Sequence, residues 1–151
     1  MIIYRISHPL FSKDLMGTGA KLHGGRWNSV GVPMLYTAEH ISLSILEMLV
    51  HSNFSDYEIA LHLVHIQAPD ASAVQTIQLN KLKKNWPTDL SYTRFIGDEF
   101  IRSKQALLLK VPSVIVPEEH NFIINPTHPD FKKITLLQTQ SFKPDKRLLH
   151  I

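Results

Sequence analysis

Five of the six glycines lie within residues 17–31, and this clustering limits the folds open to the chain more than any other feature. Glycine reaches backbone conformations that other residues avoid, so a glycine-rich stretch predicts tight turns and close backbone approaches. Residues 7–31 also lack a regular apolar period, and we expect an irregular loop there. The regular elements must therefore come from the rest of the chain.

Short apolar runs broken by prolines predict strands and helices that alternate without a regular βαβ period. Strands are expected at residues 1–6, 34–37, 57–67, 107–111, 113–116, 122–124 and 134–142. Helices are expected at residues 42–52, 80–85 and 93–103, the second stopped by Pro87 and the third a surface helix whose apolar face carries Phe95, Ile96 and Phe100. The predicted fold class is α+β, a compact single domain over residues 1–151 with mixed β-sheets.

Composition narrows the chemistry that this domain can perform. The 151 residues include no cysteine, which excludes disulfides, thiolate metal ligands and thiol nucleophiles. No apolar stretch is long enough to cross a bilayer, and the N-terminus lacks the apolar core of a signal peptide. We therefore expect a cytoplasmic protein whose chemistry depends on oxygen and nitrogen side chains.

Charge divides the chain into two unlike halves. Residues 1–75 carry four basic and six acidic side chains, a net charge of −2, whereas residues 76–151 carry twelve and seven, a net charge of +5. The basic stretches lack the interleaved aromatic residues typical of nucleic-acid binding, which favours a solvated surface. Binding of nucleic acid or of an acidic protein through this half stays open as an alternative.

Glu47 is the only charged residue among residues 43–50, which are otherwise almost wholly apolar. At 100° per residue, Leu43 and Val50 fall on one side of Glu47 and His51 falls on the other. The carboxylate should therefore lie at the edge of the core, where it needs a partner or has a raised pKa, and both are typical of active sites. The alternative is a carboxylate on a narrow polar edge of the helix.

The glycine-rich loop ends in residues 24–28, Gly-Gly-Arg-Trp-Asn. The two glycines allow close approach to a ligand, and the planar guanidinium of Arg26 suits a phosphate or pyrophosphate. Leu22 stands where a dinucleotide fingerprint needs its third glycine, and no P-loop lysine follows. A tight turn with a surface arginine is the alternative.

Three further polar residues are candidates for a site. Tyr36 ends a short predicted strand, where its ring either walls a pocket or fills the core. Ser113 lies outside any Gly-x-Ser-x-Gly context and is therefore not a nucleophile elbow. Asn125 either caps a turn or points into a site.

The nine histidines do not form a recognisable metal site. His62 and His65 lie three residues apart on a predicted strand, so their side chains point to opposite faces. The other seven are scattered along the chain, and we expect no metal.

Taken in order, the motifs of this chain resemble the RES domain, a family found in toxins of bacterial type II toxin–antitoxin systems. The matching pieces are residues 4–6, 17–20, 24–28, 31–33, 35–38, 42–47, 111–113, 121–126, 129–131 and 142–148. Because they run almost from end to end in the same order, the resemblance is specific.

The resemblance implies a fold related to ADP-ribosyltransferases and cleavage of the nicotinamide N-glycosidic bond of NAD+, with no further cofactor. Transfer to water, to phosphate or to a protein acceptor stays open. The positions that match the family's catalytic residues are Arg26, Tyr36, Glu47 and Ser113. Contacts to NAD+ are expected from Arg26, Tyr36, Gly25, Trp27 and Asn125.

The resemblance also implies a partner, a cognate Xre-like antitoxin protein, and neither a membrane nor direct nucleic-acid binding. Both a homo-oligomer and a toxin–antitoxin hetero-oligomer stay open. Loss of NAD+ would explain toxicity, and mono-ADP-ribosylation of a cellular protein is the alternative. A non-enzymatic nucleic-acid or protein binding module is a more distant alternative.

Overall fold

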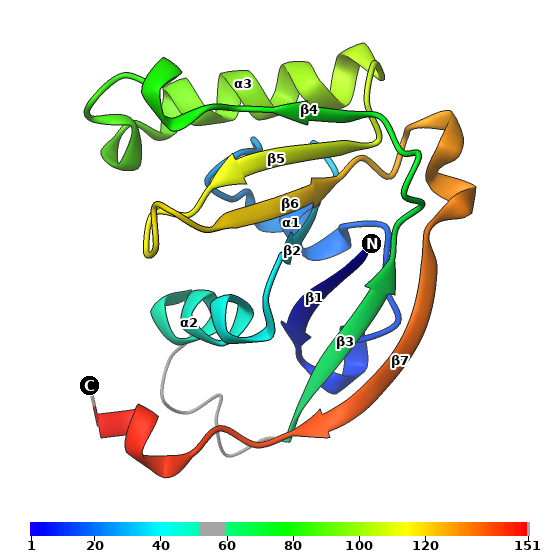
Figure 1. The fold of residues 1–151 in the computed structure, drawn as a ribbon, viewed down its shortest axis with the longest axis vertical. Helices are drawn as coiled ribbons and strands as arrows, with labels where there is room; N and C mark the ends of the chain where they lie inside the picture. The colour runs from blue at the N-terminus through cyan, green and yellow to red at the C-terminus, as the bar shows by residue number, and fades with distance from the viewer. Residues whose placement is uncertain (52–59, 151) are drawn as a thin grey trace.

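The computed structural model describes residues 1–51 and 60–150, whose strands form one seven-stranded sheet (Figure 1). The strands are β1 (Ile2–Ser7), β2 (Leu35–Ala38), β3 (Leu61–Gln67), β4 (Val74–Thr76), β5 (Leu108–Pro112), β6 (His120–Ile124) and β7 (Thr135–Phe142). The α-helices are α1 (Thr18–His23), α2 (Ile41–His51) and α3 (Leu90–Ser103). Short 3-10 helices are η1 (Pro9–Phe11), η3 (Leu79–Lys81), η4 (Trp86–Thr88), η5 (Pro129–Lys133) and η6 (Lys146–His150).

The strand order is β4-β5-β6-β2-β1-β3-β7, and β4 and β5 are parallel while the other neighbours are antiparallel. In the middle of the sheet, β1 and β2 are joined by a single residue pair, Tyr4 with Ala38. By contrast, β1 pairs with β3 over six residues. The sheet therefore consists of a β5–β6 half (β4, β5, β6, β2) and a β1–β3 half (β1, β3, β7), which run in different directions in Figure 1.

Buried apolar side chains cover both faces of the β5–β6 half. Leu108 belongs to a cluster that includes Ile3 and Val64 of the β1–β3 half. Its neighbour Leu109 belongs to a second cluster, which includes Phe100 of α3. Because consecutive strand residues point to opposite faces, this explains why the sequence of β5 is continuously apolar.

The helix α2 follows β2 directly and packs against β1 and β2, at the place where the two half-sheets meet. Leu43 is fully buried there, while Val50 on the same apolar side of the helix is 64% exposed. Glu47 and His51 are therefore carried to the boundary between the two halves. No helix in the described residues combines the length and the hydrophobicity needed to span a membrane.

The helix α3 starts at a cap, because the Asp89 carboxylate accepts a hydrogen bond from the Tyr92 backbone N–H (3.1 Å). It begins three residues earlier than the sequence predicts. Phe100 is buried as expected, but Phe95 is 68% exposed, so its assignment to the apolar face was wrong. The face that packs inward instead passes through Thr93 and Gly97, both fully or almost fully buried.

The predicted α+β class is confirmed, and most predicted strands lie within two residues of β1, β2, β5, β6 and β7. The strand expected over residues 57–67 is present from Leu61, and its residues 57–59 lie outside the described residues. The irregular loop over residues 7–31 contains two short helices, η1 and α1, that no apolar period indicated.

Two other predictions were wrong. Residues 113–116 form a turn instead of a strand, because the Ser113 hydroxyl accepts hydrogen bonds from the backbone N–H groups of Ile115 and Val116 (3.0 and 3.2 Å). Residues 80–85 do not form one helix that ends at Pro87. The chain forms η3 and η4 there, and Pro87 lies inside the first turn of η4, where its missing N–H costs nothing.

Candidate active site

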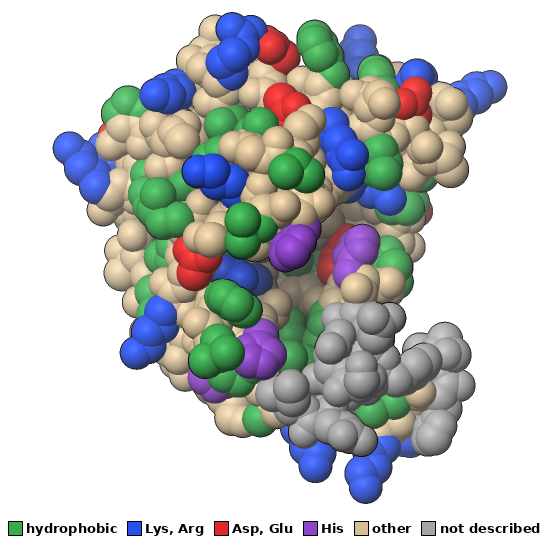
Figure 2. Space-filling view, turned by 180° about the vertical axis from the view of Figure 1, so that it is seen from behind, with side chains coloured by type: hydrophobic (Ala, Val, Ile, Leu, Met, Phe, Trp, Pro, Cys, Tyr) green, Lys and Arg blue, Asp and Glu red, His purple; other side chains and the backbone are tan. Residues whose placement is uncertain are grey.

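A cleft of about 530 Å³ opens where β1 and β2 separate, bounded by the glycine-rich loop, α2 and the ends of β5 and β6. Figure 2 shows this hollow with histidine side chains at its rim. Its charged lining residues are Arg5, Arg26 and Glu47, accompanied by His51. Although the N-terminal half of the chain has a net charge of −2, the described residues that line the cleft include two guanidinium groups and one carboxylate, a balance that suits an anionic ligand.

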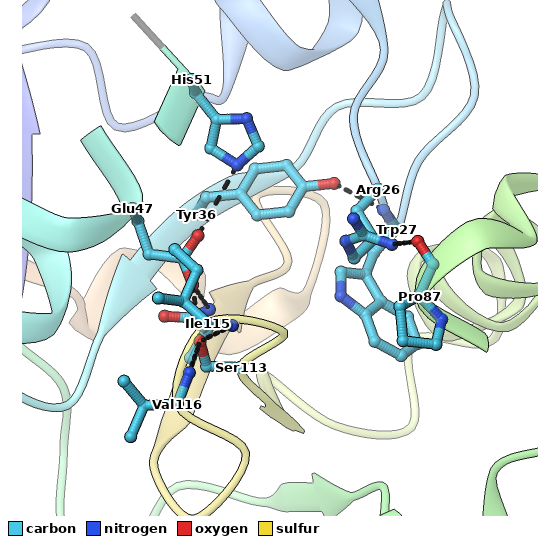
Figure 3. Close-up of polar contacts among 10 residues, drawn as sticks. Arg26, Trp27, Tyr36, Glu47, His51, Pro87, Ser113, Ile115 and Val116 are labelled. Atoms are coloured by element: carbon cyan, nitrogen blue, oxygen red, sulfur yellow. Dashed lines mark hydrogen bonds and ion pairs between the residues drawn. The ribbon is translucent and has the colours of Figure 1, made fainter. Parts of the chain in front are cut away.

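The Glu47 carboxylate is immobilised by side chains from two other elements (Figure 3). Its Oε1 accepts hydrogen bonds from the Ser113 hydroxyl (3.0 Å) and the Asn121 amide (2.6 Å). Its Oε2 lies 3.6 Å from the imidazole Nε2 of His51, one turn later on α2. Burial alone would raise the pKa of Glu47, but His51, Asn121 and Ser113 outweigh it, so the pKa is lowered. The carboxylate is therefore a fixed negative charge at neutral pH.

Ser113 is placed to position Glu47. Its side chain is fully buried and does not line the cleft. The hydroxyl donates its one proton to Glu47 and accepts from the turn that follows β5, which uses its whole hydrogen-bonding capacity. Ser113 thus connects the turn to the carboxylate and does not face the ligand space.

Tyr36 lies between Glu47 and Arg26 in Figure 3 and forms the middle of the cleft wall. Its hydroxyl donates to the Asn28 side-chain oxygen (2.7 Å) and accepts from the Trp27 backbone N–H (2.9 Å). Burial raises the pKa of the phenol well above its usual range, although the Trp27 N–H acts in the other direction. Tyr36 is therefore a neutral, rigid aromatic wall.

The guanidinium of Arg26 is oriented by η4. One of its N–H groups donates to the Pro87 carbonyl (2.6 Å), and its carbon lies 5.8 Å from the centre of the Trp86 ring. These contacts use one edge and one face of the group, and its other donors stay available to a ligand.

Two side chains of α3 hold the glycine-rich loop by donating hydrogen bonds to the loop's backbone carbonyls. The Thr93 hydroxyl donates to the Arg26 carbonyl (2.5 Å), and the Arg94 Nε donates to the Gly25 carbonyl (2.8 Å). A Cβ atom on Gly25 would lie 2.7 Å from the Tyr36 hydroxyl, and one on Gly97 would lie 1.7 Å from the Trp27 carbonyl oxygen. Both positions therefore need glycine so that the loop can approach Tyr36 and α3.

Arg5 is a second cation in the cleft wall, which the sequence did not mark as a site residue. Its guanidinium donates to the Asp14 carbonyl oxygen (2.8 Å) and to the Ser7 hydroxyl (3.3 Å), and it has no ion pair within the described residues. Burial lowers its pKa, and Asp14 offsets part of that effect. A guanidinium stays charged at neutral pH, so Arg5 presents a half-buried positive charge that forms no ion pair with the described carboxylates.

The RES domain profile matches residues 2–145, nearly the whole chain. This chain belongs to the RES domain family. The pieces that suggested this family from the sequence alone therefore identified it correctly.

Relatives of similar length carry names that describe toxins. A protein of Sphingobium sp. (strain YBL2), named Prs ADP-ribosylating toxin, is 39% identical over 90% of this chain and 87% of its own. A protein of Pseudomonas putida, named Toxin Res, is 37% identical over 98% of this chain and 99% of its own. A crystal structure of the M. tuberculosis MbcT–MbcA toxin–antitoxin complex matches with a TM-score of 0.78 at 20% identity, over 99% of this chain and 86% of that one. This last likeness shows a shared fold.

Several expected site residues of this RES domain come together and others do not. Arg26, Tyr36, Glu47 and Gly25 all line the cleft. Trp27 also lines it but is only 3% exposed, because its indole packs against Trp86 with ring centroids 5.8 Å apart. The part of Trp27 that serves the site is its backbone N–H.

Asn125 lies outside the cleft lining, so the expected contact with NAD+ is not supported by its position. It is fully buried, donates to the Ile101 carbonyl (3.1 Å) and accepts from the backbone N–H and hydroxyl of Thr127. This matches the other interpretation of the sequence, a residue that caps a turn.

The sequence interpretation of this RES domain missed Asn121 and the contact of His51 with Glu47. Asn121 pairs with Ala38 in the β2–β6 ladder, which brings its amide beside α2. Asn121 reaches Glu47 only because of this pairing register, which a single sequence does not reveal. The i, i+4 spacing of Glu47 and His51 was a visible signal.

Proposed function

We propose that this RES domain cleaves the nicotinamide N-glycosidic bond of NAD+ and acts as the toxin of a toxin–antitoxin pair. The observation that carries the proposal is the Glu47 carboxylate, ionised and fixed by three neighbours at one end of a cleft whose other charged side chains, among the described residues, are cationic. A pocket with one fixed negative charge and two guanidinium groups fits a ligand that is cationic at one end and anionic elsewhere.

The chemistry of the bond explains the need for Glu47. Nicotinamide leaves NAD+ as a neutral molecule, so little acid catalysis is needed, and positive charge develops on the ribose in the transition state. A carboxylate that is already ionised and oriented stabilises that charge without reorganising during the reaction. Glu47 meets both conditions, because its pKa is lowered and its Oε1 is held by Ser113 and Asn121.

The rest of the cleft would bind the other groups of the dinucleotide. Arg26 would hold phosphate oxygens with the donors that Pro87 leaves available, and Arg5 would add a second positive charge. The neutral ring of Tyr36 would stack on the nicotinamide or its ribose. This grip fixes the ribose against Glu47, which is the positioning part of the catalysis.

A specific finding favours a second candidate, mono-ADP-ribosylation of a cellular protein. One relative is named an ADP-ribosylating toxin. Both reactions break the same bond and use the same Glu47, and they differ only in the acceptor. An antitoxin partner is proposed on the same basis, since the M. tuberculosis protein of the same fold is described in a toxin–antitoxin complex.

The test is release of nicotinamide from NAD+ by the purified protein, in buffer, in buffer with phosphate, and with cell extract. Glu47→Gln should lower the rate by about 100-fold or more while the fold is retained. Glu99→Gln is the matched control, because Glu99 lies on the exposed face of α3 in a pair with Arg102 and should leave the rate unchanged.

The products then separate the acceptors. Free ADP-ribose indicates water, ADP-ribose 1-phosphate indicates phosphate, and a labelled protein band in extract indicates protein modification. If nicotinamide is released under none of the three conditions, or if Glu47→Gln stays active, the proposal is wrong.

A further inference from the structure

The outer edge of β7 is the long open edge of the sheet. The sheet ends at β4 on one side and at β7 on the other. β4 has three residues, whereas β7 has eight and pairs with β3 through seven of them. No strand of the described residues lies on its other side, and Figure 1 shows β7 along the outside of the molecule. Its outward backbone groups are therefore available to another chain.

The sequence of β7 lacks two features that often protect an edge strand, a charged residue and a proline, and its one irregularity lies near its start. It reads Thr-Leu-Leu-Gln-Thr-Gln-Ser-Phe and contains neither a charged residue nor a proline. A register shift opposite His65 and Ile66 leaves Leu137 unpaired with β3, and residues 138–142 then pair regularly. Those five residues offer an uninterrupted edge of the kind that binds an extended peptide as an additional strand.

Basic side chains flank both ends of this edge. Lys132 and Lys133 precede β7 in η5, and Lys143, Lys146 and Arg147 follow it. The nearby acidic residues are already engaged, since Asp130 pairs with Lys133 (3.1 Å) and Asp145 pairs with Arg147 (2.9 Å). Within residues 1–51 and 60–150, no ion pair involves Lys132, Lys143 or Lys146.

This charge pattern decides which partner fits the edge. Pairing with a second copy of the chain would bring together two sets of flanking basic residues, and their repulsion disfavours it. An acidic chain would face them favourably. A single-stranded nucleic acid binds by stacking its bases on aromatic side chains, but β7 has one aromatic residue, the half-buried Phe142. The backbone N–H and C=O groups of a strand edge instead pair with the backbone of a peptide.

We infer that the β7 edge binds an extended acidic segment of a partner protein, which joins the sheet as an eighth strand. Backbone hydrogen bonds along residues 138–142 give the pairing, and Lys132 and Lys143 attract the acidic side chains at its two ends. No residue of β7 lines the cleft, so this surface is separate from the one proposed to act on NAD+. The inference does not depend on that activity.

The probe is a fluorescent eight-residue peptide, Glu-Val-Thr-Glu-Val-Thr-Glu-Val, and its control has proline in place of the three valines, which removes N–H donors at equal charge. We expect saturable binding of the first peptide that weakens as salt rises. Hydrogen exchange should show slower exchange on binding for those amides of residues 138–142 that point away from β3, while NAD+ cleavage is measured separately.

Charge reversal provides the matched variants. Lys132→Glu with Lys143→Glu should weaken binding at least fivefold. Lys81→Glu with Lys84→Glu makes the same change in net charge at exposed positions around η3 and should leave binding unchanged.

The inference is overturned if the first peptide does not bind, if the proline peptide binds equally well, or if both double variants lose affinity equally. It is also overturned if the amides of residues 138–142 are unchanged on binding. If, without peptide, the amides of residues 138–142 exchange more slowly as the protein concentration rises, the edge instead binds a second copy of the chain. Displacement of the peptide by a single-stranded oligonucleotide, without protection of those amides, would assign the basic residues to nucleic acid.

Discussion

The two walls of the cleft hold their charged groups in different ways. On the carboxylate wall, Glu47 is fixed by side chains, the Ser113 hydroxyl and the Asn121 amide. On the guanidinium wall, Arg26 is fixed by the backbone carbonyl of Pro87. The loop that carries Arg26 is itself held on α3, because its backbone carbonyls accept hydrogen bonds from the Thr93 hydroxyl and the Arg94 Nε.

This difference determines where each wall is vulnerable. A group held by side chains can be released by a single substitution that leaves the backbone in place. Behind the guanidinium wall, the backbones of α3 and the loop also approach each other so closely at Gly97 that a side chain there would force a whole element to shift. We therefore expect substitutions on the carboxylate wall to affect the reaction rate, and substitutions behind the guanidinium wall to affect the fold.

The largest effect is expected from Gly97→Ala, behind the guanidinium wall. Its Cβ would lie 1.7 Å from the Trp27 carbonyl oxygen, so α3 or the loop must move. We expect a loss of about 3 kcal/mol or more in the free energy of unfolding, measured by denaturant titration. Gly19→Ala is the control, because its Cβ meets nothing within 4 Å and it lies in α1, where alanine is favourable. Equal stability of the two variants would contradict the close approach of α3 to the backbone of the loop at Gly97.

Next in size is Ser113→Ala on the carboxylate wall. Without the hydroxyl, Glu47 loses one donor and two backbone N–H groups of the turn lose their acceptor. We expect a cost of about 1–3 kcal/mol in unfolding free energy and a fall of about tenfold in kcat. Ser103→Ala, at an exposed position at the end of α3, should change neither. An unchanged kcat would mean that Asn121 alone positions the carboxylate.

Arg26→Lys tests the guanidinium wall from its ligand side. Lysine keeps the charge but loses the planar fork and the contact with Trp86. We expect KM for NAD+ to rise about tenfold with kcat nearly unchanged, as for lost ground-state binding. Arg102→Lys, in the exposed pair with Glu99, is the control. A change mainly in kcat would place Arg26 at the reacting bond.

The smallest effect is the pH dependence of stability that Glu47 contributes. Its pKa is lower in the folded protein than in the unfolded chain, where it is about 4.3. Its ionised form therefore stabilises the fold fully above that value, and the contribution is lost as pH falls through the folded pKa. The stability advantage of the wild type over Glu47→Gln should be constant from neutral pH down to about pH 5 and should shrink as the pH falls below about 4.3. An advantage that grows on acidification would contradict the lowered pKa.

The carboxylate wall could be predicted from the sequence in part. A lone acidic residue in an apolar helix must lie at the core edge, and Glu47 does. Its partners could not be predicted, because Ser113 reaches it only through a turn and Asn121 only through the β2–β6 register. Local patterns record neither relation.

The cation in β1 shows a different limit. Arg5 sits in a strand whose neighbours are apolar, and a polar strand residue is usually taken to face water. Its guanidinium is only half-buried and donates to the backbone carbonyl of Asp14, a contact between the strand and the following loop that a strand pattern does not record. Asn125 is the opposite case. It was expected to contact the ligand, but it is fully buried and its amide donates to a backbone carbonyl.

The single residue pair between β1 and β2 explains where the cleft comes from. If the antiparallel ladder continued in the register of Tyr4 with Ala38, Arg5 would face Thr37 and Ile6 would face Tyr36. All four of those residues line the cleft instead. The cleft thus occupies the region where β1 and β2 diverge and do not pair. A ligand lying there occupies the space of a missing inter-strand contact, and the site cannot be removed without closing the sheet.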